Sequence, residues 1–220
     1  MSFLSKLFGK KPTPTRELKH PSQLIKGDII TLDDSFALPM QLKGQQFQVD
    51  NINCYQYQHE IEPEWVLSSS QGHTIYMTLE QDDELTLLFN LKLTKAQIDD
   101  LFDLDQFSQI FAQPHQNFTQ LFNLTSATRT ALGDWLASDY HQTSFAEYGY
   151  FHRQRSHYEL KIQPNLTGEA VELYQLTDQQ NQFVINIEVY EDGTTEVCLG
   201  RRRPLTDIRE YWPAPDTHQR

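Results

Sequence analysis

Two glutamates near the C-terminal end of the chain, Glu188 and Glu196, have the type and spacing of a paired-carboxylate site. The stretch FVINIEVYEDGTTEVCLG predicts a β-hairpin with a three-residue loop over 191–193, in which Gly193 takes the left-handed position. This register gathers the apolar residues of both strands on one face and sets the two glutamates opposite each other on the other face. Because like charges directly opposed on a sheet are destabilising, the pair predicts a compensating group.

Two interpretations of the glutamate pair stay open. In the first, the carboxylates bind a cation or share a proton for acid–base work. In the second, they lie on a solvated face or are neutralised by an arginine. The candidate arginines are Arg153, Arg155 and Arg201.

An arginine-rich stretch, GRRRPLTDIRE, follows the hairpin. Arg201, Arg202 and Arg203 precede a segment that carries Arg209. Guanidinium groups suit carboxylates and phosphates, so the cluster predicts docking of an acidic partner or a phosphorylated ligand. The alternative is a set of internal ion pairs with acids such as Asp207. The chain has no glycine-rich phosphate loop that would favour the ligand.

The elements that position these residues are β-rich at both ends of the chain. Alternating apolar patterns predict strands over 24–93, as a small antiparallel meander or barrel with a bulge near Asn51. Strands return between 148 and 203, and the stretch 157–163 is expected to be one of them.

Helical patterns separate and follow these strands. Thr94 and Gln97 fit a capping box, and the apolar spacing predicts two short helices with a break at 103–105. Ser126 is a possible cap for another helix. The stretch PLTDIREYWP predicts a short C-terminal helix.

The fold class expected from these elements is α+β. Two β-rich antiparallel units are joined by short helices and followed by a short C-terminal helix. The predicted organisation is a basic tail and linker at 1–20, a β unit with short helices at 21–112, and a helical connection, second β unit and C-terminal helix at 113–220.

Charge is distributed unevenly in this chain, whose net charge is −12. Residues 1–26 hold six basic residues and one acidic residue, a net charge of +5, and the other 194 residues hold 12 basic and 29 acidic residues, a net charge of −17. A body this acidic repels phosphates, so nucleic-acid binding is not expected. The sequence also lacks motifs for a metal site, a cofactor or a catalytic nucleophile, so none of these is predicted.

The N-terminal stretch MSFLSKLFGKK has the pattern of a short interfacial helix rather than a secretory signal or a membrane span. It predicts either a weak, reversible membrane or partner contact, or a tail without a contact. The apolar face would hold Phe3, Leu4, Leu7 and Phe8, flanked by Lys6, Lys10 and Lys11.

Four stretches, FLSKLFGKK, LIKGDII, INIEVYEDGTTEV and LGRRRPLTDIREYWP, resemble the YjfK-like family of bacterial proteins of unknown function. The resemblance implies a cytoplasmic protein, or one held peripherally at the inner membrane surface, with a protein partner of the phage-shock type. It implies no catalytic residues. The function expected first is therefore a non-enzymatic accessory or adaptor protein. The alternative is an enzyme or a small-ligand or metal-binding protein that uses Glu188, Glu196 and Arg201–Arg203.

Overall fold

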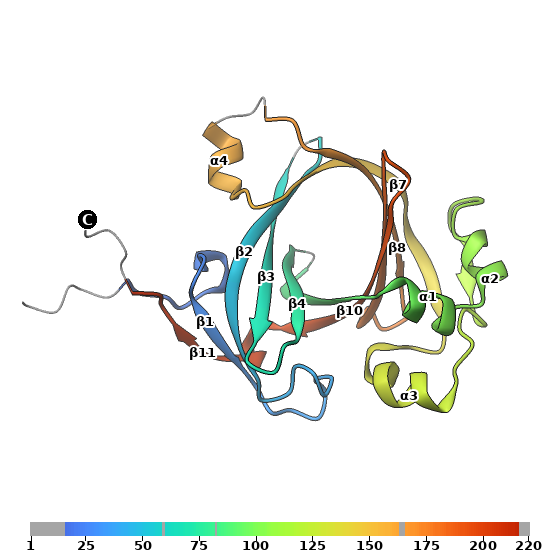
Figure 1. Cartoon of the computed structure of the whole chain (residues 1–220), viewed down its shortest axis with the longest axis horizontal. Coiled ribbons are helices and arrows are strands. Elements are labelled where there is room, and N and C mark those ends of the chain that lie inside the picture. Colours follow the sequence, from blue (N-terminus) through green and yellow to red (C-terminus); the bar gives the residue numbers. More distant parts are fainter. Residues whose placement is uncertain (1–15, 59, 82, 163–165, 216–220) are drawn as a thin grey trace, which may run out of the picture.

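The structure is a computed structural model that describes residues 16–58, 60–81, 83–162 and 166–215. Strands dominate it (Figure 1). The strands are β1 (Ile29–Leu32), β2 (Gln46–Gln56), β3 (Ile61–Ser69), β4 (Thr74–Gln81), β5 (Leu85–Lys92), β6 (Asn117–Phe118), β7 (Tyr140–His152), β8 (Glu169–Thr177), β9 (Phe183–Tyr190), β10 (Thr195–Pro204) and β11 (Ile208–Trp212). The α-helices are α1 (Lys95–Leu101), α2 (Leu104–Gln109), α3 (Ser126–Leu132) and α4 (His157–Ile162), and short 3-10 turns are η2 (Pro21–Gln23), η3 (Gly133–Trp135) and η4 (Leu205–Asp207).

All described strands belong to one antiparallel sheet in the order β11-β1-β2-β3-β4-β5-β10-β9-β8-β7-β6. An additional pairing of β2 with β7 closes eight of them, β2-β3-β4-β5-β10-β9-β8-β7, into a ring around a common centre (Figure 1). The pairing joins the second half of β2, Cys54–Gln56, to the end of β7 at Tyr150–His152.

The two strands that close the ring are long, and each has two partners on the same edge. The first half of β2 pairs with β1, and the first residues of β7 pair with β6. Both strands carry bulges. The register of β2 against β3 shifts between Val49 and Asn51, as the sequence predicted, and β7 shifts twice between Gln142 and Glu147. Bulges bend a strand and increase its twist, which lets the edges of the sheet meet.

The two faces of the sheet differ in polarity. One face is apolar on neighbouring strands and forms most of the main core. The other face carries polar side chains together with a small second core cluster of Tyr55, Phe151, Val171 and Tyr190. It points into the ring, because Tyr55 on β2 reaches Glu188 on β9 across it, although two strands separate them by the shorter way round. The apolar face includes Trp65, Met77, Phe89, Leu176, Ile185 and Leu199.

Two segments outside the ring cover the apolar face: residues 16–45 before β2, and residues 93–139 between β5 and β7. Leu42 and Trp135, one from each segment, are fully buried. The segments also meet directly, because Trp135 Nε1 donates a hydrogen bond to Gln41 Oε1 at 3.0 Å.

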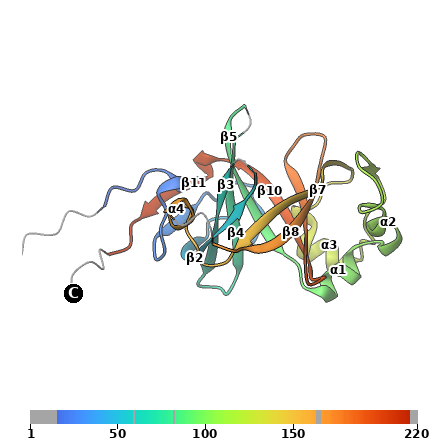
Figure 2. The same ribbon diagram turned by 90° about the horizontal axis from the view of Figure 1, so that it is seen from above.

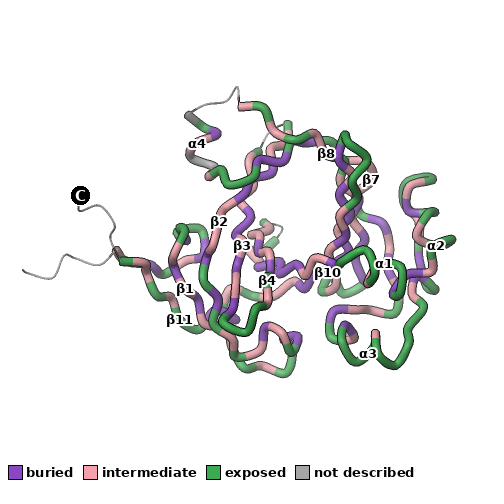
Figure 3. The backbone as a smooth tube through the Cα atoms, in the orientation of Figure 1, coloured by how far each residue is buried: buried purple, intermediate pink, exposed green. Residues whose placement is uncertain are grey.

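The helices lie at the ends of the molecule rather than between two units. In both ribbon views α1, α2 and α3 lie together beside β7 and β8, and α4 and β11 lie at the opposite end (Figures 1 and 2). Buried positions follow the strands, and exposed positions gather on the helices and the hairpin tips (Figure 3). None of the described helices is long and apolar enough to cross a membrane.

The expected fold class is therefore wrong. Residues 24–93 do not close on themselves, because the edge of β5 pairs with β10 and joins both halves of the chain in one sheet. The short C-terminal helix is also wrong. After η4, the residues from Ile208 to Trp212 form β11 and pair with β1, whose outer edge would otherwise leave its backbone groups unpaired.

The short helices in the middle of the chain are confirmed. Thr94 and Gln97 form the capping box of α1, and the expected break separates α1 from α2, which Asp103 caps. The third helix begins one residue beyond its cap, Thr125, rather than at a Ser126 cap.

Candidate functional site

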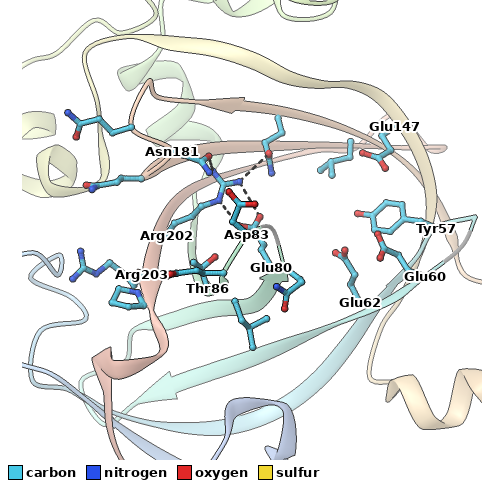
Figure 4. A pocket seen from close by; sticks show the side chains of 18 residues that line it. Tyr57, Glu60, Glu62, Glu80, Asp83, Thr86, Glu147, Asn181, Arg202 and Arg203 are labelled. Atoms are coloured by element: carbon cyan, nitrogen blue, oxygen red, sulfur yellow. Dashed lines mark hydrogen bonds and ion pairs between the residues drawn. The ribbon is translucent and has the colours of Figure 1, made fainter.

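A pocket with a volume of about 630 Å³ opens at one end of the ring. Its walls come from the ends of β3, β4, β5 and β10, from the middle of β7 and β8, and from the turns beside them (Figure 4). These strands are far apart in the sequence, so only closure of the ring brings the lining side chains together. The volume lies within the range typical of small-molecule sites.

The pocket is strongly acidic. Two arginines, Arg202 and Arg203, are the basic side chains among its described lining residues, and both are already paired. Arg202 Nε and Nη2 donate to Glu80 at 2.5 and 3.2 Å, and Arg203 Nε donates to Asp207 at 2.5 Å. The acidic lining residues are Glu60, Glu62, Glu80, Asp83, Glu84 and Glu147.

Glu62 is the carboxyl group of the pocket whose pKa is raised. Burial, the charge of Glu60 and the charge of Glu80 raise its pKa to about 7, and a hydrogen bond with Glu60 acts in the same direction. Glu60 and Glu62 therefore form a carboxyl pair in which Glu62 is partly protonated at neutral pH.

Tyr57 forms an aromatic wall between this pocket and a second hollow of about 740 Å³. A Cβ atom at Gly149 would lie 3.0 Å from the Tyr57 ring and 3.0 Å from the Gln56 carbonyl oxygen. The Tyr57 ring therefore packs more closely on Gly149 than it could on a residue with a side chain. Tyr148 and Tyr150 line the second hollow in an edge-to-face pair with centroids 5.4 Å apart.

Deeper in the ring, two glutamates meet around one tyrosine. The Tyr55 hydroxyl lies 2.6 Å from Glu188 Oε1 and 3.4 Å from Glu64 Oε1, and Tyr190 donates to Glu188 Oε2 at 2.5 Å. Asn53 Nδ2 donates to Glu64 Oε2 at 2.8 Å. Burial and the charge of Glu188 raise the pKa of Glu64 to about 7, and burial raises the pKa of Glu188.

The predicted hairpin register is confirmed, but the two opposed glutamates have different partners. Glu188 lies opposite Glu196, with Ile187 opposite Val197 and the loop turning at Gly193 with φ of 84°. The compensating group for Glu196 is Lys92 of β5, which forms an ion pair with it. Glu188 instead turns to the two tyrosines inside the ring.

The arginine cluster is dispersed by the alternation of β10. Arg202 points into the pocket, whereas Arg201 lies on the apolar face, stacked at 3.7 Å on the Phe183 ring. Arg209 lies on β11 and pairs with Asp33 at 3.3 Å. The ion pairs of Arg202, Arg203 and Arg209 are therefore internal.

The N-terminal residues expected to contact a membrane or a partner lie outside the described residues. They are Phe3, Leu4, Lys6, Leu7, Phe8, Lys10 and Lys11.

The central residues of the site, Tyr55, Glu62, Glu64 and Glu147, are absent from the sequence-based candidates. For two of them the sequence does carry a signal. In EIEPEW, acidic and non-acidic residues alternate, which places Glu60, Glu62 and Glu64 on one face of a strand. The tyrosine that bridges Glu64 and Glu188 has no such signal, because 133 residues separate it from Glu188.

The side chains of the site do not form a metal centre. Over the described residues, no group of three or more histidine, cysteine, aspartate or glutamate side chains is placed to hold a metal ion.

Comparison with known proteins identifies a family but no relative of known function. A model of a domain of unknown function, DUF4178, matches residues 39–204, which span β2 to β10 and include every residue of the pocket and of the inner glutamate pair. No curated protein and no solved structure matches the chain. The chain belongs to the DUF4178 family of domains of unknown function.

Proposed function

We propose that this protein binds a small organic cation of the alkylammonium class in the acidic pocket at the end of the ring. The observation that carries the proposal is the acidic lining of the pocket, where six carboxyl groups gather and both arginines are already paired. Burial and the charge of Glu60 raise the pKa of Glu62 in this lining to about 7. An ammonium group placed beside Glu62 would replace its proton.

The remaining lining residues support a cation rather than an anion. Glu147 and Asp83 add negative charge, and the donors of Arg202 are already engaged by Glu80, Asn181 and other acceptors. The aromatic wall at Tyr57 suits the alkyl part of such a ligand and offers a ring face to its charge.

Isothermal titration calorimetry with tetramethylammonium, n-butylammonium and guanidinium, and with the neutral n-butanol as a matched control, tests this proposal. We expect at least one of the cations to bind and n-butanol not to bind. Glu62→Gln and Glu147→Gln should each weaken binding about tenfold, the equivalent of about 1.4 kcal/mol. Glu210→Gln removes an equal charge from exposed β11 and should leave binding unchanged. Equal binding of butanol and butylammonium would refute the proposal.

We infer a second candidate function, an accessory protein of the YjfK-like kind, from a different part of the surface. The Phe36 and Met40 side chains are 97% and 75% exposed, on a loop whose Leu38 and Leu42 are buried beneath them. Large apolar side chains held out on an anchored loop are typical of a protein contact. A partner of the phage-shock type, at the inner membrane surface, is the one that the family resemblance implies.

A pull-down with a purified phage-shock-type protein tests this second candidate. The full chain should retain the partner, and a Phe36→Ser, Met40→Ser double variant should lose it, whereas Leu104→Ser, at an exposed leucine on α2, should not. Equal retention by the double variant and the full chain would contradict the role of the loop.

A further inference from the structure

The hydrogen bonds inside the ring fix the number of protons around Tyr55. A tyrosine hydroxyl has one hydrogen to donate, and Tyr55 and Tyr190 stay protonated because burial raises the pKa of both. Tyr190 gives its hydrogen to Glu188 Oε2 at 2.5 Å. Tyr55 therefore has one hydrogen for two carboxyl groups.

Two buried carboxylates around a single donor repel each other, and a proton on one of them relieves that repulsion. When Tyr55 donates to Glu188, the proton belongs on Glu64, and the Tyr55 oxygen is the nearest acceptor in these contacts. When Tyr55 donates to Glu64, Glu188 must carry the proton instead. The contact at 2.6 Å to Glu188 is shorter than the contact at 3.4 Å to Glu64, which favours the first arrangement.

We infer that Glu64 and Glu188 share one proton across the Tyr55 hydroxyl and form a buried proton-binding site inside the ring, separate from the carboxyl pair in the pocket. The two side chains belong to β3 and β9, and their residues are 6% and 8% exposed. This site goes beyond the proposed function and does not depend on a cation binding at the mouth.

The surroundings of the pair leave it short of positive charge. Lys92, which lines the small cavity beside the pair, forms an ion pair with Glu196, the residue opposite Glu188. Arg153, which follows β7 and lines the same cavity, forms an ion pair with Glu169. The other titratable groups facing the pair are Glu62 from β3, Tyr76 and Glu80 from β4, Tyr57 just after β2, Tyr190 from β9 and Cys198 from β10.

A route for protons exists between this site and solvent. Glu64 and Glu188 line a cavity of about 60 Å³, and that cavity shares Glu62, Tyr57 and Glu80 with the open pocket. The volume suffices for a water molecule or two. The shared proton can therefore exchange with bulk water through the mouth, and the interior carries one negative charge on this pair instead of two.

Carbon-13 NMR of the ligand-free full chain, labelled at the glutamate side-chain carboxyl carbon, tests the inference. Besides the resonance of Glu62, we expect a second resonance that titrates near pH 7 and disappears in Glu64→Gln. In that variant the proton affinity of Glu188 should fall at least tenfold, and Glu188→Gln should lower that of Glu64 likewise, because each neutralisation removes the neighbouring charge. Glu172→Gln, on the opposite face of β8, should change neither.

Tyr55→Phe separates proton sharing from simple burial. Without the hydroxyl, Glu188 loses a donor at 2.6 Å and Glu64 loses only a contact at 3.4 Å, so the pKa of Glu188 should rise more than that of Glu64. Unchanged titrations in Tyr55→Phe, or titration of both carboxyls below pH 5.5 in the parent protein, would overturn the inference.

If the variants of Glu64, Glu188 and Tyr55 do not fold, a variant of the pocket tests the inference instead. Infrared spectra of Glu62→Gln, which lacks the proton of the pocket, should show a buried carboxylic acid band at pH 6 that shifts when glutamate is carbon-13 labelled. Absence of that band would overturn the inference as well.

Discussion

Glu188 and Glu196 face each other across β9 and β10, and the structure resolves their repulsion by giving them different partners. Lys92 neutralises Glu196 from β5, and Tyr55 and Tyr190 donate to Glu188 from inside the ring. As a consequence, the neighbouring carboxyl group that is left without a cation beside Glu188 is that of Glu64, not that of Glu196. A carboxylate pair does exist, but its second member comes from another part of the chain.

The pH dependence of stability should report the buried proton. The pKa of Glu64 is about 7 in the folded chain and near 4.5 when unfolded, so the folded state binds the proton more tightly. Its contribution to the free energy of unfolding is full below pH 4.5 and is lost as the pH rises to about 7, a change on the order of 3 kcal/mol. Urea unfolding of the parent protein and Glu64→Gln at several pH values measures it. A constant difference between the two across pH 4.5–7.5 would contradict the assignment.

Removing Arg202 should strengthen cation binding while it weakens the fold. Arg202→Gln leaves Glu80 without its partner, which should cost about 1–3 kcal/mol of stability because both groups are partly buried. The pocket gains one net negative charge, so the affinity for n-butylammonium should rise roughly fivefold. Calorimetry and urea unfolding give the two values. Arg209→Gln is the control, because its ion pair with Asp33 lies on the exposed β11 edge. Weaker binding in Arg202→Gln would argue against a site for cations.

The packing of the Tyr57 ring against Gly149 should be disrupted by a single added methyl group. In Gly149→Ala the new Cβ meets the ring and the Gln56 carbonyl oxygen at 3.0 Å, so the ring must move. We expect a loss of about 1–3 kcal/mol in stability and several-fold weaker cation binding. Gly133→Ala is the matched control, because its Cβ would meet only Arg129 at 3.8 Å. Chemical unfolding and calorimetry on both variants measure whether the position of the Tyr57 ring affects stability and cation binding. Equal values for the two variants would contradict this prediction.

The ion pair of Lys92 and Glu196 should show coupling in a double-mutant cycle. Lys92→Met leaves Glu196 uncompensated opposite Glu188 and should cost about 1–2 kcal/mol, a value reduced by the partial exposure of both side chains. Adding Glu196→Gln should recover at least about 0.5 kcal/mol of that loss. Additive effects in urea unfolding would mean that Lys92 does not act through Glu196.

Local features of this fold could be predicted from the sequence. The β9–β10 register followed from burial of Ile187 and Val197 on one face, and the α1 capping box followed from Thr94 and Gln97, since both depend on neighbours within a few residues. The bulge near Asn51 showed in the change of alternation.

Two local patterns in the sequence predict the wrong element. Residues 157–163 were expected as a strand, but Ser156 and Glu159 form reciprocal capping bonds and the chain continues as α4. The apolar stripe of PLTDIREYWP indicated a helix, but β1 offers an unpaired edge, and the segment pairs with it as β11. Tertiary pairing decided the second case.

Closure of the ring could not be predicted in this way. It depends on the pairing of Cys54–Gln56 with Tyr150–His152, nearly 100 residues apart, and on the pairing of β5 with β10. The site inherits this dependence, because Tyr55, Glu64 and Glu188 meet only in the closed ring. The alternating glutamates of EIEPEW are the one feature of the site that is visible in the sequence.

Proton release on binding of n-butylammonium at pH 7 tests the central claim most directly. It is measured by calorimetry in two buffers that differ in ionisation enthalpy. With a pKa of about 7, Glu62 is half protonated, so a bound ammonium should release roughly half a proton. Glu62→Gln should bind more weakly and release none. Binding with no proton release in the parent protein, or no binding of any of the three cations, would contradict the account.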